Sequence, residues 1–266
     1  FRPQHAAILN ISPDHLERHK SITKYMKIKS KIFLGQKNND YSYIGNTNKY
    51  SKLLIQNLKR KVLKSKLIII NQKKCKSLLK KIKNEYLKTN CNISNISFAY
   101  EIVKKFKIKD SIIIKALNKF KGLPHRQKVI FLNNKVKCID DSKATSFDAS
   151  LQSLKSYDKI YWIVGGLPKI GDHFDLGNVS KKIIKAYIVG KHVSFFVSKI
   201  KKKVPYKISL NLKNAIKDIN HDIKINKNLF SNILLSPAAA SYDQHKNFED
   251  RGNHFKNLII KKFKKY

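Results

Sequence analysis

Strand-like and helix-like segments alternate through the second half of this 266-residue chain. Short apolar runs predict strands at 159–164, 187–189, 206–208 and 232–235. Segments with a helical period lie before, between and after them, at 147–154, 179–186, 192–202, 212–219 and 248–263. Because parallel strands need a crossover connection, which a helix usually provides, the pattern predicts a parallel sheet with helices on both faces. The expected fold class is therefore α/β.

The first half mixes the same two patterns less regularly. Strands are expected at 5–11, 41–44 and 67–70, and helices at 21–33, 49–62, 76–86, 92–106 and 110–120, the last opening on an Asp-Ser cap. The triplet Gly122-Leu123-Pro124 then interrupts the helical pattern. It marks a predicted boundary between domains at 1–121 and 122–266. A hairpin around Asn133-Asn134, with strands at 128–132 and 136–139, is expected soon after it.

Basic residues outnumber acidic ones by 57 to 17, and the formal net charge is +40. Such a balance indicates an acidic partner. Only five of the basic residues are arginines, however, and nucleic-acid-binding proteins favour arginine for its planar, bidentate hydrogen bonding. Since lysines are spread along the whole chain, a composition drawn from an AT-rich genome explains the bias better. The alternative hypothesis is a basic Rossmann-like module that binds nucleic acid or another polyanion, with an affinity for DNA that falls steeply as salt rises.

The cysteines and the apolar runs indicate the cellular compartment of the protein. Cys75, Cys91 and Cys138 contain no CxxC pair, so they support neither a disulfide framework nor a thiolate zinc site and favour a reducing cytoplasm. No apolar run reaches the roughly 18–20 residues of a membrane-spanning helix, and the N-terminus has no secretion-signal core. The chain begins with Phe1 rather than methionine, just before a predicted strand, so we expect a fragment of a longer protein.

Polar residues suited to chemistry gather in a few segments. His15 and His19 stand four apart, as two metal ligands on one helical face would, but Glu17 does not fit the H-E-x-x-H motif. Asn92 and Asn95 lie one helical turn apart, and their amides can both donate to and accept from an adenine edge. Taken alone, the second pair is better explained as an Asn-rich helix cap.

The remaining segments follow the predicted boundary or the predicted strands. Arg126 directly follows the boundary, where it can close on a phosphate. The turn 140–145 (DDSKAT) can aim backbone N–H groups at an anion. Because the carboxyl ends of parallel strands meet at one edge of a sheet, we expect the turns 140–145, 165–169 and 236–243 to converge. No G-x-x-x-x-G-K-[ST] motif occurs in the chain.

In this order, these segments resemble the Mur ligase family, and within it the branch that adds D-glutamate. The likeness is strongest at 7–29, 123–126, 141–145 and 235–252, and weak at 35–88. The motif SPAAASYDQHKNFEDRG is similar to that branch, and the D-N-P-R signature of the diaminopimelate- or lysine-adding branch is absent. The resemblance implies the C-terminal part of a P-loop ATPase-like central domain, followed by a Rossmann-like C-terminal domain. It also implies that the first domain and the P-loop are missing, and that this chain alone is inactive.

The activity that the resemblance implies is that of an ATP- and Mg²⁺-dependent ligase of peptidoglycan synthesis, and hence of cell-wall formation, cell shape and cell division. Such an enzyme joins D-glutamate to UDP-N-acetylmuramoyl-L-alanine through an acyl phosphate. The same likeness implies a cytoplasmic monomer that neither binds nucleic acid nor inserts into a membrane.

The resemblance also assigns residues to roles. His15 and Lys29, the latter as a carbamate, would hold Mg²⁺, and both together with Lys169 would be catalytic. The residues expected to bind ATP are Asn92, Asn95, Arg126, Asp141 and Lys143. Those expected to bind D-glutamate are Thr145, Lys169, Ser241, Tyr242 and Phe248. Four departures from the family pattern, at Ser146, Leu167-Pro168, Ala239 and His245, bear on the shape of the D-glutamate loop but not on its chemistry.

Overall fold

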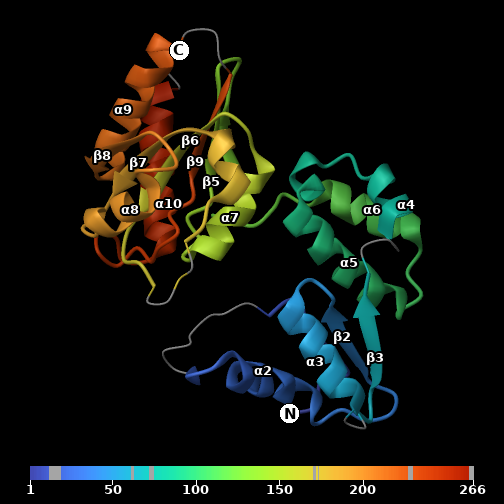
Figure 1. The fold of residues 1–266 in the computed structure, drawn as a ribbon. Coiled ribbons are helices and arrows are strands. Elements are labelled where there is room, and N and C mark those ends of the chain that lie inside the picture. The colour runs from blue at the N-terminus through green and yellow to red at the C-terminus, as the bar shows by residue number, and fades with distance from the viewer. Residues whose placement is uncertain are drawn as a thin grey trace. The chain divides into compact units, whose positions relative to one another are not determined.

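The computed structural model describes residues 1–11, 19–60, 63–71, 75–169, 172, 174–226 and 230–263. The chain divides into two compact units, Phe1–Phe120 and Lys121–Tyr266, which we call unit 1 and unit 2 (Figure 1). Each unit combines parallel strands with helices, so the predicted α/β class is confirmed. No helix in the described part of the chain is both long enough and apolar enough to cross a membrane.

Unit 1 contains a parallel sheet in the order β1-β2-β3. Its elements are β1 (His5–Ile8), α2 (Ile22–Ser30), the 3-10 helix η1 (Lys31–Phe33), β2 (Tyr41–Gly45), α3 (Lys49–Arg60), β3 (Lys66–Ile70), α4 (Lys76–Lys81), the 3-10 helix η3 (Glu85–Lys88), α5 (Asn90–Lys104) and α6 (Asp110–Lys119). Helix α3 buries Leu54, Ile55 and Leu58 in the core and leaves most of its basic side chains exposed. This amphipathic division, visible in the sequence, is what docks the helix on the sheet.

Two predictions in unit 1 were wrong. The helix expected at 76–86 ends at Lys81, because Ile82 is extended and Asn84 caps the separate 3-10 turn by accepting from the Tyr86 N–H. Asp110 does not cap α6: Lys109 occupies the N-cap position, and Asp110 is the first helical residue. There its carboxylate pairs with Lys104 of α5 at 3.1 Å.

Unit 2 contains a six-stranded sheet in the order β4-β5-β9-β6-β7-β8. The predicted hairpin is confirmed as the antiparallel pair β4–β5, and all the other pairs in this sheet are parallel. The elements are β4 (Lys128–Leu132), β5 (Val136–Asp140), α7 (Phe147–Ser156), β6 (Ile160–Gly165), the 3-10 helix η4 (Gly177–Lys182), β7 (Ile183–Val189), α8 (Val193–Ile200), β8 (Tyr206–Leu210), α9 (Leu212–Ile225), β9 (Ser231–Leu235) and α10 (Phe248–Phe263).

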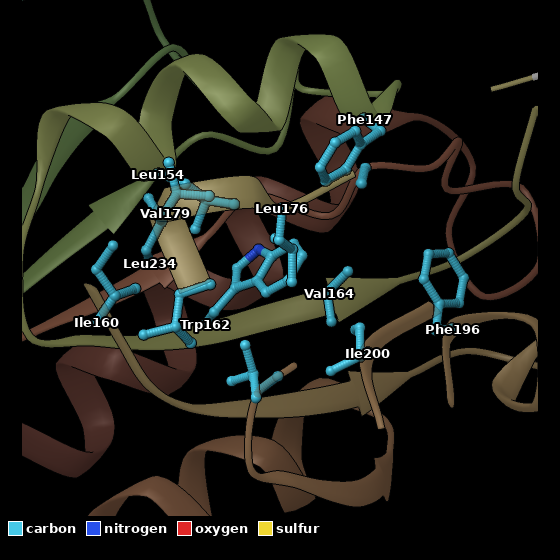
Figure 2. Close-up of a cluster of buried hydrophobic side chains, with 14 of the residues drawn as sticks. Phe147, Leu154, Ile160, Trp162, Val164, Leu176, Val179, Phe196, Ile200 and Leu234 are labelled. Atoms are coloured by element: carbon cyan, nitrogen blue, oxygen red, sulfur yellow. The ribbon is translucent and has the colours of Figure 1, made fainter. Parts of the chain in front are cut away.

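The sheet of unit 2 is buried on both faces. Along β6, Trp162 and Val164 belong to one core cluster, while Tyr161 and Ile163 belong to the other. The first cluster includes residues of α7 and α8, and the second includes residues of α9 and α10, so helices cover both faces as predicted (Figure 1). Figure 2 shows the first cluster, in which Leu154, Leu176 and other apolar side chains surround the indole of Trp162.

The prediction of a helix at 179–186 was wrong. A 3-10 turn occupies Gly177–Lys182, and Ile183 already begins β7, which pairs with β6 on one side and β8 on the other. A short apolar run has no periodicity of its own that separates strand from helix. The pairing of β7 with a strand on each side decided the outcome.

Candidate active site

The turns that follow β5, β6 and β9 converge at one edge of the unit 2 sheet, as predicted. The Asp141 N–H donates to the Leu235 carbonyl at 2.8 Å, and the Gly165 N–H donates to the Pro237 carbonyl at 2.9 Å. Leu167 and Ala240 form an antiparallel bridge through two hydrogen bonds of 2.9 and 3.0 Å. The turns 140–145, 165–169 and 236–243 are thus tied to one another by their backbones.

Arg251 of α10 connects two of these turns, 140–145 and 236–243. Its guanidinium donates to the Ser142 hydroxyl and carbonyl at 2.9 and 2.8 Å and to the Ala239 carbonyl at 3.0 Å. The residue is only 3% exposed, and burial lowers the pKa of Arg251 to about 10. Nη1 has no hydrogen-bond partner among the described residues and lies beside Gly166. A buried positive charge thus lies against the converging turns, where it attracts anions.

Two predicted site residues, Lys143 and Phe248, contact each other at the start of α10. The Lys143 ammonium lies 3.7 Å from the centre of the Phe248 ring, which is within cation–π distance. The Phe248 carbonyl accepts a hydrogen bond of 2.8 Å from the Ser142 hydroxyl. Lys143 and Thr145 are half-buried, and Arg126 is exposed. These contacts hold a lysine at the rim of the site on a fixed aromatic surface.

Asp141, which we expected to bind ATP, is turned inward. It is 6% exposed, and its carboxylate accepts from the hydroxyls of Ser153 and Ser236 at 2.5 and 2.8 Å and from the Gln127 N–H at 3.2 Å. Its described contacts therefore join α7, the turn after β9 and the segment after the unit boundary. A contact between Asp141 and ATP remains a prediction.

Replacement of Asp141 by asparagine is expected to reduce the pH dependence of unit 2 stability. Burial raises the pKa of Asp141 to about 6, against a usual value near 4. Because the folded pKa lies above the unfolded one, this group's contribution is complete below about pH 4 and is lost as pH rises through about 6, by up to about 3 kcal/mol. Urea unfolding at pH 4.5 and 7, followed by Trp162 fluorescence, measures the change. Equal pH dependence in wild type and Asp141→Asn would contradict the assignment.

Apart from Phe248, which begins α10, the residues expected to bind D-glutamate lie on the same converging turns. Lys169 ends the 165–169 turn and is half-buried. The carbonyl of Ser241, which is buried, accepts from the N–H groups of Gln244 and His245, so that a tight turn follows it. Tyr242 is 72% exposed. Hydroxyl residues and a lysine on neighbouring turns form a donor set that suits a dicarboxylate.

Unit 1 carries the other predicted residues. Lys29 lies in the last turn of α2, with its ammonium 4.9 Å from the Tyr25 ring centre. It lines a hollow of about 280 Å³ together with residues 7–10, which include the end of β1, and Ile32. His15 lies outside the described residues. In the described part of the chain, no group of three or more His, Cys, Asp or Glu side chains is placed to hold a metal ion.

The two asparagines of α5 have different surroundings. The Asn92 amide donates to the Tyr86 carbonyl at 2.7 Å and so ties the 3-10 turn η3 to the helix. Asn95 is exposed. The amide nitrogen of Asn92 therefore already has a structural contact. The side-chain oxygen of Asn92 is the atom that an adenine amino group would use.

Sequence reasoning did not assign roles to Asp140, His125 or Arg251. Arg251 could have been found from composition: an arginine is rare in this lysine-rich chain, and it lies at the end of the strongest motif. The Asp140 carboxylate lies 2.7 Å from His125 Nδ1, within hydrogen-bond distance, although the two residues are fifteen positions apart. No local pattern predicts such a pairing.

Comparison with known proteins points to the same family that the sequence motifs resemble. Residues 1–116 match the family model described as the Mur ligase middle domain. Two proteins named "UDP-N-acetylmuramoylalanine--D-glutamate ligase", from Rickettsia felis and Rickettsia prowazekii, are 34% and 33% identical to this chain over 97% of its length. The chain spans 61% of the length of each of these relatives.

Solved structures share the fold. The MurF ligase of Thermotoga maritima in complex with ADP superposes with a TM-score of 0.68 and is 16% identical, over 98% of this chain and 63% of that one. MurF of Acinetobacter baumannii gives a TM-score of 0.67 at 15% identity, over 97% of this chain and 59% of that one. At these identities the likeness concerns the fold alone.

Proposed function

This chain belongs to the Mur ligase family, and on that premise we propose that it forms the central and C-terminal parts of an ATP-dependent ligase that joins D-glutamate to UDP-N-acetylmuramoyl-L-alanine. Residues 1–121 would belong to the central, ATPase-like domain, and residues 122–266 would form the C-terminal domain that binds the amino acid. The enzyme would work as a cytoplasmic monomer in peptidoglycan synthesis. The names of the relatives at 30–34% identity support this choice within the family.

The observation that carries the proposal is the convergence of three turns above a buried arginine. Amide formation from a carboxylate needs an activated acyl group, and ATP supplies the activating phosphate when it is bound. The negative charge of phosphates and of a dicarboxylate must be met by fixed cations. Arg126, Lys143 and Lys169 lie on segments that backbone hydrogen bonds join together, and Arg251 adds a buried positive charge beneath them.

Roles for these side chains follow from their surroundings. Arg126, which is exposed, and Lys143, which is held on the Phe248 ring, would bind the phosphates of ATP. Lys169 would pair with a carboxylate of D-glutamate, with Thr145, Ser241, Tyr242 and Phe248 around it. Asn92 and Asn95 would contact adenine. Lys29 fits a magnesium site only as its carbamate, since an ammonium group repels a divalent cation.

Replacement of Lys169 by alanine is expected to lower kcat/KM for D-glutamate by about 10- to 150-fold, the loss that removal of a charge-assisted hydrogen bond produces. The assay is D-glutamate-dependent phosphate release by the complete gene product that carries this sequence. Lys181→Ala, at an exposed lysine of η4, is the matched control and should leave the rate unchanged. Full activity of Lys169→Ala would remove this residue from the site.

Substrate choice provides a second, independent check. The same assay with L-lysine or diaminopimelate in place of D-glutamate should give no phosphate release above background. Release with either of these amino acids, and none with D-glutamate, would place the protein in another branch of the family.

A further inference from the structure

We propose that Asp140 and Asp141 are positioning residues that clamp the turn 123–127 on both sides of Arg126 and so hold that arginine in place for an anionic group. The inference rests on the proposed function, because the anionic group would be a phosphate of ATP. It assigns to the two adjacent carboxylates a task that the proposed function does not include.

The turn that carries Arg126 is strained. His125 and Gln127, its two neighbours, have φ angles of +57° and +47°, in the left-handed region that residues with a side chain rarely adopt. Each such residue costs on the order of 1 kcal/mol or more, and such conformations persist where surrounding contacts enforce them. The turn therefore needs a partner that holds it.

The segment 140–143 is that partner. The Asp140 carboxylate lies 2.7 Å from His125 Nδ1, and the Asp141 carboxylate accepts from the Gln127 N–H at 3.2 Å. The Lys143 N–H donates to the His125 carbonyl at 3.0 Å. One carboxylate thus holds the residue before Arg126, and the next carboxylate holds the residue after it.

The clamp is packed rather than exposed to solvent. The side chains of His125 and Asp140 are 12% and 3% exposed, and the rings of His125 and Phe248 pack edge to face with a centroid distance of 6.1 Å. Gly252 of α10 lies directly against the pair: a Cβ atom there would be 2.1 Å from His125 Nδ1 and 2.8 Å from the Asp140 carboxylate. The helix approaches this closely because the position has no side chain.

Two neighbouring carboxylates that are both buried repel each other, and the charge of Asp140 contributes to the raised pKa of Asp141. The arrangement is therefore costly for stability. What it provides is a fixed backbone for an exposed arginine, five residues after Lys121, where unit 2 begins. A side chain on a rigid support loses less conformational freedom when it binds its ligand, which strengthens binding.

The test uses the complete gene product and compares Asp140→Ala with Asp140→Asn. Alanine removes the acceptor for both His125 and the Ser142 N–H, whereas asparagine keeps a hydrogen-bonding side chain. We expect Asp140→Ala to raise KM for ATP about 10-fold and to change KM for D-glutamate less than 2-fold. Asp140→Asn should restore most of the affinity for ATP.

A double-mutant cycle separates positioning from general damage. If Asp140 acts through Arg126, Asp140→Ala should lower kcat/KM for ATP less than 2-fold in an Arg126→Ala background. An equal loss in both backgrounds would overturn the proposal. Should Asp140→Ala fail to fold, His125→Ala, which removes the other half of the pair, is measured in the same two backgrounds.

Hydrogen–deuterium exchange tests the clamp without any assay of activity. The amides of Gln127 and Lys143 should exchange about 10-fold faster in Asp140→Ala, or in His125→Ala, than in the wild type. Unchanged exchange would overturn the clamp whatever the enzyme does. If the wild type lacks D-glutamate-dependent phosphate release, the proposed function fails, and the exchange result still decides whether the clamp exists.

Discussion

Replacement of Gly165 by alanine is expected to destabilise unit 2 by more than about 3 kcal/mol or to prevent its folding. Gly165 ends β6 with a φ angle of +133°, and a Cβ atom there would lie 1.9 Å from the Val189 carbonyl oxygen. The obstacle is the backbone of the neighbouring strand β7, which cannot rotate away as a side chain could. The strands must separate or the turn must change its path, and both routes break sheet hydrogen bonds.

Gly177→Ala is the matched control for this prediction. Gly177 also has a positive φ angle, +45°, but no atom lies within 4 Å of its ideal Cβ position. Only backbone strain of about 1 kcal/mol is expected there. Urea unfolding of both variants, followed by Trp162 fluorescence, measures the difference, and similar midpoints would show that the close approach at Gly165 is tolerated. Because Gly165 begins the turn that leads to Lys169, the proposed function implies that a folded variant also binds D-glutamate less tightly.

Replacement of Trp162 by alanine is expected to cost about 3–5 kcal/mol of unfolding free energy. Trp162 is fully buried in the centre of β6, among the side chains of Figure 2. Its indole N–H donates to the Ser236 carbonyl at 2.8 Å, so the side chain also supports the turn after β9. Alanine would leave a cavity and remove this donor together.

Trp162→Phe separates the two contributions. Phenylalanine fills most of the space but cannot donate to Ser236, so its cost should be less than half that of alanine. Since Trp162 is the single tryptophan, unfolding of both variants must be followed by far-UV circular dichroism. A loss below about 1 kcal/mol in Trp162→Ala would show that the core repacks around the gap.

Much of the fold could be predicted because its signals are local. The apolar run of β6 and the helical period of α10 both fall within one element, and the predicted range of α10 agrees with Phe248–Phe263. The segment 183–186 was mistaken for helix because a few apolar residues fit either structure. Its place between β6 and β8 in the sheet, a long-range property, made it a strand.

The sequence was sufficient to predict the α/β class, the convergence of the turns after β5, β6 and β9, and the resemblance to the Mur ligases, because hydrophobic period and motif order are written along the chain. The pairing of His125 with Asp140, the inward direction of Asp141 and the burial of Arg251 under the turns emerged only in three dimensions. Such contacts join residues from fifteen to more than one hundred positions apart, and which side chains meet depends on how the sheet brings distant strands together.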